Sequence, residues 1–239
     1  MARDRDMQPW AQQLVQRLLS WGLEGAPLPI PWPGGISPLR IKSARELAAE
    51  YQRDLKGRGL DAIVSAFIED QARWNAGTGF VTGLGGFAFL PIQLPAAVTA
   101  TWVIQTRMVA TIAILNGFDL DHEAVQTQIL LTLIGDEAGE VLKQIGVKFG
   151  QHMAQAQLRR LPTTALTAIN QAVGFRLISR FGSGGVVRLH KAIPLLGGVI
   201  GGGVDYLMTR QLGQFAAIEL GRRSPDRSRE EVIDIEVVD

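Results

Sequence analysis

The segment Ile193-Pro-Leu-Leu-Gly-Gly-Val-Ile-Gly-Gly-Gly-Val-Asp-Tyr-Leu207 places five glycines within seven positions of a strongly apolar run and then adds an aspartate. Proline is favoured in the first turn of a helix, so Pro194 predicts a helix over 194–220. Such a helix is roughly 40 Å long, and its glycines destabilise it by about 4 to 5 kcal/mol relative to alanine. Helical spacing gathers on one narrow stripe Gly198, Gly201, Gly202, Asp205, Thr209 and Gly213. We therefore expect a second helix to pack closely along this stripe.

Glycines four positions apart occur in two parts of the chain, and this spacing lets helix backbones approach each other closely. The glycines expected at such contacts are Gly79, Gly83 and Gly86 in a glycine- and proline-rich segment, and Gly197, Gly198, Gly201 and Gly202 in the helix. The packing helps most in lipid, where hydrophobic association is absent, but soluble cores use it as well. It is therefore consistent with membrane association and not diagnostic of it.

A second unusual feature is the uncharged run from Trp74 to Thr106. It contains 33 residues, more than the roughly 18 that suggest a transmembrane helix. Glycines and prolines interrupt it, and its most helix-compatible part reaches Arg107 after 11 residues. We therefore predict an apolar hairpin around residues 79–95 that is either buried or enters a membrane from one side.

Helical periodicity predicts most of the remaining structure. Ser43 and Glu46 form a capping-box pattern at the start of the first helix of the main domain. Further helices are predicted at residues 61–75, 96–115, 119–153 and 163–181, and the alternative for 119–153 is a break near Gly146 or Gly150. Strand signals are weak, because β-branched runs with period-two alternation are scarce. The expected fold is all-α, with a single multi-helix domain over 43–220.

The two ends of the chain, residues 1–42 and 221–239, are predicted to lie outside this domain. Trp10, Leu14, Leu18 and Trp21 form one face of a helix over 8–21. We expect this face to dock on the protein's own core, with a membrane interface or a protein partner as alternatives. The proline-rich residues 26–35 favour an extended linker or strap. The C-terminal stretch is charge-dense and is predicted to be a mobile tail that could dock on a partner.

The composition and the spacing of motifs argue against several classes of function. The net charge of +1 lacks the basic excess of nucleic-acid-binding proteins, so no nucleic acid is expected. The absence of cysteine excludes disulfides and thiolate metal sites, and it suits a bacterial cytoplasmic protein. His122, His152 and His190 lie too far apart for a metal motif, and no dinucleotide or phosphate loop is present. We therefore predict no metal, cofactor or catalytic residue, and the sequence does not decide whether the protein is an enzyme.

Arg107 stands on an apolar helix face between Val103 and Thr111. A buried guanidinium needs a carboxylate or several carbonyls, because an unpaired buried charge is strongly unfavourable. We expect a structural ion pair and predict Asp205 as its partner, with Asp119 and Asp136 as the other candidates. The alternative is that Arg107 binds an anionic headgroup or substrate.

Six phrases, in order along the chain, resemble the bacterial EcsC family over about residues 43–220. They are Gly79-Phe-Val-Thr-Gly-Leu-Gly-Gly86, Leu90-Pro-Ile-Gln-Leu-Pro95, Arg107 with Ile112-Ala113, Gly117-Phe-Asp-Leu-Asp121, Ile169-Asn-Gln-Ala-Val-Gly-Phe-Arg-Leu177, and Ile193 to Asp205. The resemblance implies a mostly helical domain of unsettled biochemical role, named after a protein encoded beside ABC transporter subunits. It implies no catalytic residues.

Three functions remain open. The first is a non-enzymatic protein that binds lipid or a membrane protein through the apolar hairpin and the glycine helix, as an accessory to transport or secretion. Such a protein would lie in the cytoplasm, peripheral to the inner face of the membrane. The second is a soluble interaction module that docks through residues 8–21 or 222–239. The third is an enzyme for an apolar or lipid-like substrate, which requires Arg107, Asp205 and His190 to converge.

Overall fold

The structure is a computed structural model that describes residues 2–25, 27–32, 35–84, 90–146, 158–182 and 194–221. Its elements are α1 (Ala2–Glu24), β1 (Pro27–Trp32), β2 (Gly35–Arg40), α2 (Ala44–Asp54), α3 (Leu60–Leu84), α4 (Leu90–Leu115), α5 (Glu123–Ile134), the 3-10 helix η2 (Gly135–Glu137), α6 (Ala138–Gln144), α8 (Thr163–Gly182) and α9 (Pro194–Gly221). Helices dominate, which confirms the predicted all-α class, and one short hairpin accompanies them.

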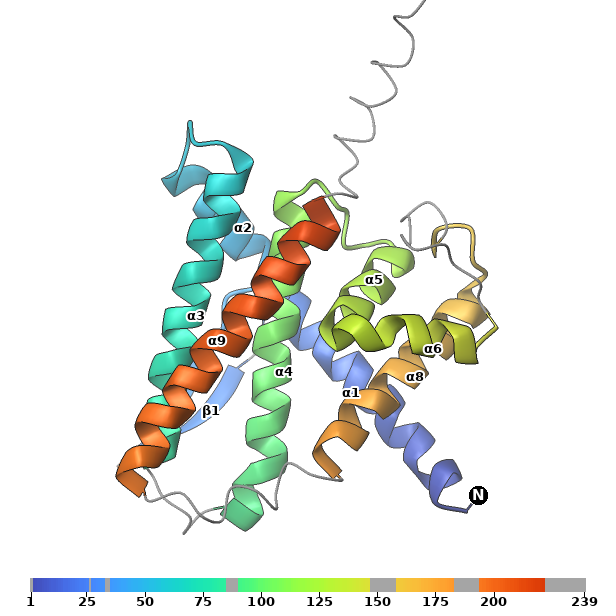
Figure 1. The fold of residues 1–239 in the computed structure, drawn as a ribbon, viewed down its shortest axis with the longest axis horizontal. Coiled ribbons are helices and arrows are strands. Elements are labelled where there is room, and N and C mark those ends of the chain that lie inside the picture. Colours follow the sequence, from blue (N-terminus) through green and yellow to red (C-terminus); the bar gives the residue numbers. More distant parts are fainter. Residues whose placement is uncertain are drawn as a thin grey trace, which may run out of the picture.

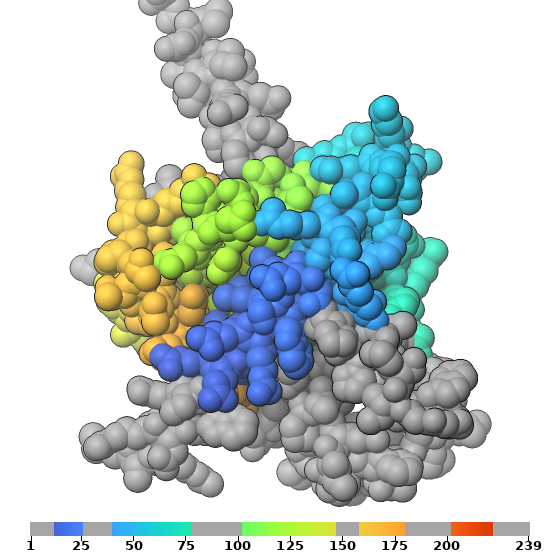
Figure 2. All heavy atoms as spheres, turned by 180° about the vertical axis from the view of Figure 1, so that it is seen from behind, coloured from blue at the N-terminus to red at the C-terminus, as the bar shows by residue number. Residues whose placement is uncertain are grey.

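The long helices α3, α4 and α9 form one side of the molecule, and α5, α6 and α8 form the other (Figure 1). α3 and α9 run antiparallel and make the most extensive contact between any two described elements. α1 packs on α4 and α8, and it crosses the opposite face of the molecule between α2 and α8 (Figure 2). Apolar side chains from these helices form one buried cluster.

The predicted capping box starts α2. The Ser43 hydroxyl accepts a hydrogen bond from the Glu46 amide at 3.1 Å, and the Glu46 carboxylate accepts one from the Ser43 amide at 2.7 Å. Two backbone donors that the helix leaves unpaired at its start are thereby satisfied. The hydrogen bond from the Ser43 amide is the main cause of the lowered pKa of Glu46, since it favours the charged carboxylate.

The helices beside the predicted hairpin extend further into it than expected. α3 continues to Leu84 instead of ending near residue 75, and α4 begins at Leu90 instead of residue 96. Pro91 falls in the first turn of α4, where a helix needs no N–H donor, so it does not prevent this earlier start. Residues 85–89, including Gly86, lie outside the described part of the chain.

The helix predicted over 119–153 is divided at Gly135, where no break was predicted, and it ends again at Gln144, close to the predicted break near Gly146. α5 ends at Ile134, and Gly135 then adopts φ 57° and ψ −126°, a conformation that side chains disfavour. The predicted caps also differ from those observed. The Asp119 carboxylate accepts a hydrogen bond from the Asp121 amide in the preceding turn, and α5 starts after His122.

The proline-rich strap forms an antiparallel hairpin, in which Pro29 pairs with Pro38 and Trp32 pairs with Gly35. Alternate residues of a paired strand direct their N–H groups away from the partner. Prolines at alternate positions 27, 29 and 31 can therefore all occupy outward positions, so the ladder loses no donor. The extended conformation was predicted, but the pairing was not.

α1 is part of the helical core. Leu18 is fully buried, Val15 is nearly so, and Leu14 packs against the same cluster. A Cβ atom added at Gly22 would lie 2.8 Å from Cγ2 of Thr106 on α4, so the two helices touch closely there. The expectation that this face docks on the protein's own core is confirmed for Leu14 and Leu18, whereas Trp21 is exposed.

α9 packs on α3 along the predicted small-residue stripe. Gly202, Thr209 and Gly213 are buried, and a Cβ atom at Gly213 would lie 2.7 Å from Cγ2 of Ile68. The partner helix expected from the glycines therefore belongs to the same chain. Asp205 departs from the prediction, because it lies at the edge of this stripe and is exposed.

Candidate functional site

Three uncharged helix segments lie at one end of the molecule, on the side formed by α3, α4 and α9. The final turns of α3, from Trp74, and the first turns of α4, up to Thr106, belong to the uncharged run. The first turns of α9, up to Val204, are uncharged as well. These three segments lie together at the lower end of the molecule in Figure 1. They are far apart in the sequence, and the antiparallel packing of α3 and α9 brings them to one end.

α9 carries exposed apolar side chains where its uncharged segment ends. Val204, Leu207 and Met208 lie on the side of the helix opposite the buried stripe, and Leu207 is 55% exposed. We call these three residues the α9 patch. On α3, the uncharged segment begins at Trp74, whose side chain is 42% exposed. Large apolar side chains are thus exposed beside the uncharged end.

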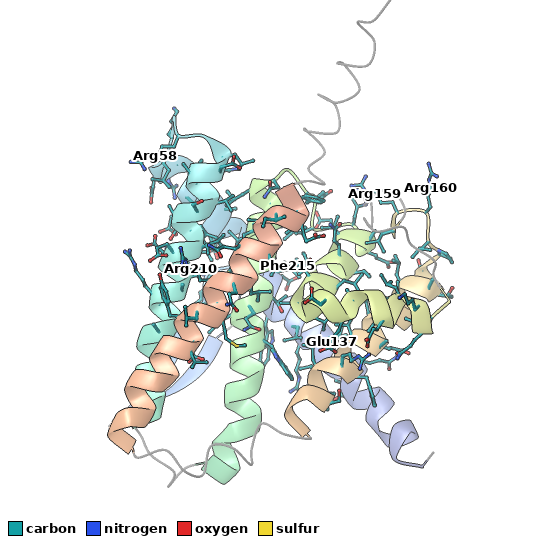
Figure 3. All side chains as sticks on the ribbon, viewed as in Figure 1. Arg58, Glu137, Arg159, Arg160, Arg210 and Phe215 are labelled. Atoms are coloured by element: carbon teal, nitrogen blue, oxygen red, sulfur yellow. The ribbon has the colours of Figure 1, made fainter. Side chains whose placement is uncertain are left out.

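Charged groups gather immediately above this level. The Tyr206 hydroxyl donates to both carboxylate oxygens of Glu69, at 2.9 and 3.0 Å, and Arg73 and Arg210 pair with the same carboxylate. The hydrogen bond from Tyr206 lowers the pKa of Glu69, and the same bond raises the pKa of Tyr206. Arg210 extends on the α3 side of α9 (Figure 3). This cluster links α3 to α9 where the uncharged segments begin.

A buried polar layer crosses the interior at the same level. The Asn75 side-chain amide donates to the Thr209 hydroxyl at 2.9 Å, which joins α3 to α9. Arg107 on α4 donates from Nη2 to Oε1 of Gln71 on α3, at 3.1 Å. All four side chains are buried.

Arg107 is only 6% exposed, and its Nε atom is buried without a hydrogen-bond partner. Burial lowers its pKa to about 10, so the guanidinium remains charged at neutral pH. Among the described residues no carboxylate lies within ion-pair distance of it. A charge buried with one neutral partner costs several kcal/mol, which makes this arrangement unfavourable for the protein alone.

The predicted pair of Arg107 and Asp205 is not formed. Arg107 bonds to Gln71, and Asp205 makes no ion pair or hydrogen bond with the described residues. The register of α9 explains this result, because Thr209 occupies the buried position of the stripe while Asp205 lies at its edge. Neighbouring side chains partly shield the Asp205 carboxylate from water, and this raises its pKa. His190, the third member of the proposed catalytic group, lies outside the described residues.

The other predicted site residues have separate outcomes. Trp21 is exposed, and the Arg17 guanidinium lies 6.0 Å from the centre of its ring. The side chain of Trp10 is outside the described part of the chain, and so are the surroundings of Gly79, Gly83, Gly197, Gly198 and Gly201. Asp119 and Asp136, the other candidate partners of Arg107, are exposed and do not approach it.

Sequence reasoning missed Gln71 and the α9 patch. Gln71 was not predicted, because a polar residue within a helix is usually taken as solvent-exposed. Its contact with Arg107 also joins residues 36 positions apart, which helical spacing does not relate. Leu207 falls outside the small-residue stripe, but helical spacing alone does not show that this side of α9 is uncovered. Only the packing of α9 on α3 reveals that exposure.

Among the described residues, no helix combines the length and apolarity needed to cross a membrane. No group of three or more histidine, aspartate or glutamate side chains in those parts of the chain could hold a metal ion.

The EcsC protein family matches residues 40–223, which include α2 to α9 and leave α1 outside. No curated protein and no solved structure matches the chain.

Proposed function

Since the chain belongs to the EcsC protein family and membership assigns it no reaction, we propose from its geometry that it binds the membrane surface. In this proposal the uncharged ends of α3, α4 and α9 enter one leaflet. The observation that carries the proposal is the exposed α9 patch beside these three uncharged ends. Exposed apolar groups of this kind mark sites that meet lipid or another protein.

The lengths of the segments suit one leaflet. Residues 74–84 of α3 and 194–204 of α9 each span about 16 Å at about 1.5 Å per residue. The hydrocarbon region of a bilayer is about 30 Å thick, so one leaflet contributes about 15 Å. The uncharged ends of α3 and α9 would therefore reach the middle of the bilayer. The longer uncharged part of α4, residues 90–106, spans about 25 Å and would not cross it either.

The residues at the boundary also suit an interface. Tryptophan and tyrosine favour the level of the lipid headgroups, and Trp74 and Tyr206 occupy the boundary on α3 and α9. Arg73 and Arg210 lie beside them. In contrast, the labelled Arg58, Arg159 and Arg160 lie at the other end of the molecule (Figure 3). The proposed location is cytoplasmic and peripheral to the inner face of the membrane.

Leu207→Glu is expected to weaken binding to phosphatidylcholine vesicles by about tenfold or more. The change removes the burial of a leucine, which contributes about 1.5 kcal/mol or more, and it brings a charge to the lipid. Sedimentation with vesicles over a range of lipid concentrations measures the partition. Because the contact is uncharged, wild-type binding should persist at moderate salt.

Ile218→Glu provides the matched control. Ile218 is 52% exposed on the same side of α9, but it lies about three turns from Leu207 and farther from the uncharged end. Its substitution should leave vesicle binding unchanged. A wild-type protein that remains in the supernatant at low and moderate salt would refute the proposal, and so would equal losses in the two variants.

A further inference from the structure

The Arg107 guanidinium is a cation inside the bundle, and none of the described side chains neutralises it. Arg107 has one hydrogen bond, to the neutral side chain of Gln71, and its Nε donor is buried and unpaired. Most buried polar groups in proteins have partners, and buried charges are usually paired. A bound anion could accept a hydrogen bond from Nε and neutralise the buried charge of Arg107.

The position of Arg107 indicates the direction from which such a group would come. On α4 it is the first charged residue after the uncharged run, and Gln71 lies three residues before Trp74 on α3. The hydroxyls of Thr106 and Thr111 are engaged with backbone carbonyls of their own helix, at Trp102 and Arg107. Unlike these two hydroxyls, the guanidinium still has a donor free to bind a ligand where the uncharged ends of α3 and α4 begin.

We propose that Arg107 and Gln71 bind the anionic oxygen group, a phosphate or carboxylate, of a single amphiphile whose apolar tail lies at the uncharged end of the bundle. A guanidinium is planar and presents Nε and Nη donors in a fork that matches two oxygens of one anion. Gln71 holds Nη2 and thereby fixes the orientation of the fork. The inference rests on the proposed function, since it names the class of lipid bound at the same end.

An amphiphile is favoured over a free anion because the helix segments next to Arg107 carry no charge. A free phosphate would have to lose its hydration beside segments that carry no charge, and its burial there is unfavourable. An attached alkyl chain changes this balance, because its own transfer out of water contributes about 0.8 kcal/mol for each methylene. Head and tail are therefore both required for tight binding.

Calorimetric titration with four small probes tests the inference, each kept below its micelle concentration. The probes are n-octyl phosphate, octanoate, inorganic phosphate and octanol. We expect one equivalent of octyl phosphate or octanoate to bind wild-type protein, and Arg107→Gln to weaken that binding by about 10- to 100-fold, as for a charge-assisted hydrogen bond. Arg58→Gln, which changes an exposed arginine at the opposite end of the molecule, should leave the affinity unchanged.

Three results would overturn the inference. Unchanged affinity in Arg107→Gln would remove the role of the guanidinium. Binding of inorganic phosphate as tight as that of octyl phosphate would assign the site to a free anion, and equal binding of octanol would make it a purely apolar site. The unliganded Arg107→Gln protein should unfold at a temperature equal to or above that of wild type, because a buried charge is removed. A large decrease would show instead that Arg107 is structural.

Vesicle binding separates this inference from the proposed function. Leu207→Glu should lose vesicle binding and keep octyl phosphate binding, because Leu207 is exposed on the far side of α9 from the buried stripe. Vesicle binding without octyl phosphate binding would overturn the amphiphile site and leave the proposed function intact. Binding of octyl phosphate without vesicle binding would do the reverse.

Discussion

Leu18→Ala is expected to lower the free energy of unfolding by about 2 to 5 kcal/mol, although Leu18 lies outside residues 40–223 of the family match. The side chain is fully buried in the cluster shared with α4 and α8, so its loss would leave a cavity. Denaturant unfolding followed by circular dichroism measures the change. A decrease of this size would show that α1 is an integral part of the folded domain.

The exposed side of α1 supplies the control for this prediction. Gln16→Ala, at an exposed position of the same helix, should change the free energy of unfolding by less than about 0.5 kcal/mol. Similar small effects in both variants would mean that α1 is a dispensable appendage. In that case its apolar face would again be a candidate for membrane or partner contact.

Gly213→Leu is expected to lower the free energy of unfolding by about 3 kcal/mol. A Cβ atom at this position would stand 2.7 Å from Cγ2 and 2.9 Å from Cγ1 of Ile68, and a branched side chain this close to its own backbone has little room to move. The leucine would therefore force α9 away from α3, and such overpacking is strongly unfavourable. Thermal or denaturant unfolding measures the loss.

Gly203→Leu tests the same exchange where space is available. Gly203 is exposed on the same helix, and nothing lies within 4 Å of a Cβ atom added there. Leucine has a higher helix propensity than glycine, so this variant should be more stable than wild type by several tenths of a kcal/mol. Destabilisation by both variants to the same degree would contradict the account of the glycine stripe as a close-packing surface.

The sequence was sufficient to predict several helix starts and the close packing of α9 along its small-residue stripe. Pro194 and the capping box at Ser43 are local signals, so they predicted helix starts correctly. The stripe through Thr209 and Gly213 also followed from helical spacing. These features depend on neighbours within one or two turns, which the sequence displays directly.

The site was less predictable, because its contacts join residues far apart in the chain. Arg107 was recognised as an unusual buried charge, but the choice of Asp205 assumed a rotation of α9 that helical spacing does not fix. A small rotation about the helix axis separates a residue at the centre of an interface from one at its edge. Gln71 became its partner through the packing of α3 against α4.

The entry of the uncharged end into lipid is tested most directly by a fluorescent label on α9. The chain has no cysteine, so Leu207→Cys and Ile218→Cys each provide one labelling site for an environment-sensitive dye such as NBD. On addition of phosphatidylcholine vesicles, we expect a blue shift and an increase in emission at position 207 and no change at position 218. An unchanged spectrum at 207, or equal changes at both positions, would contradict the membrane-binding account.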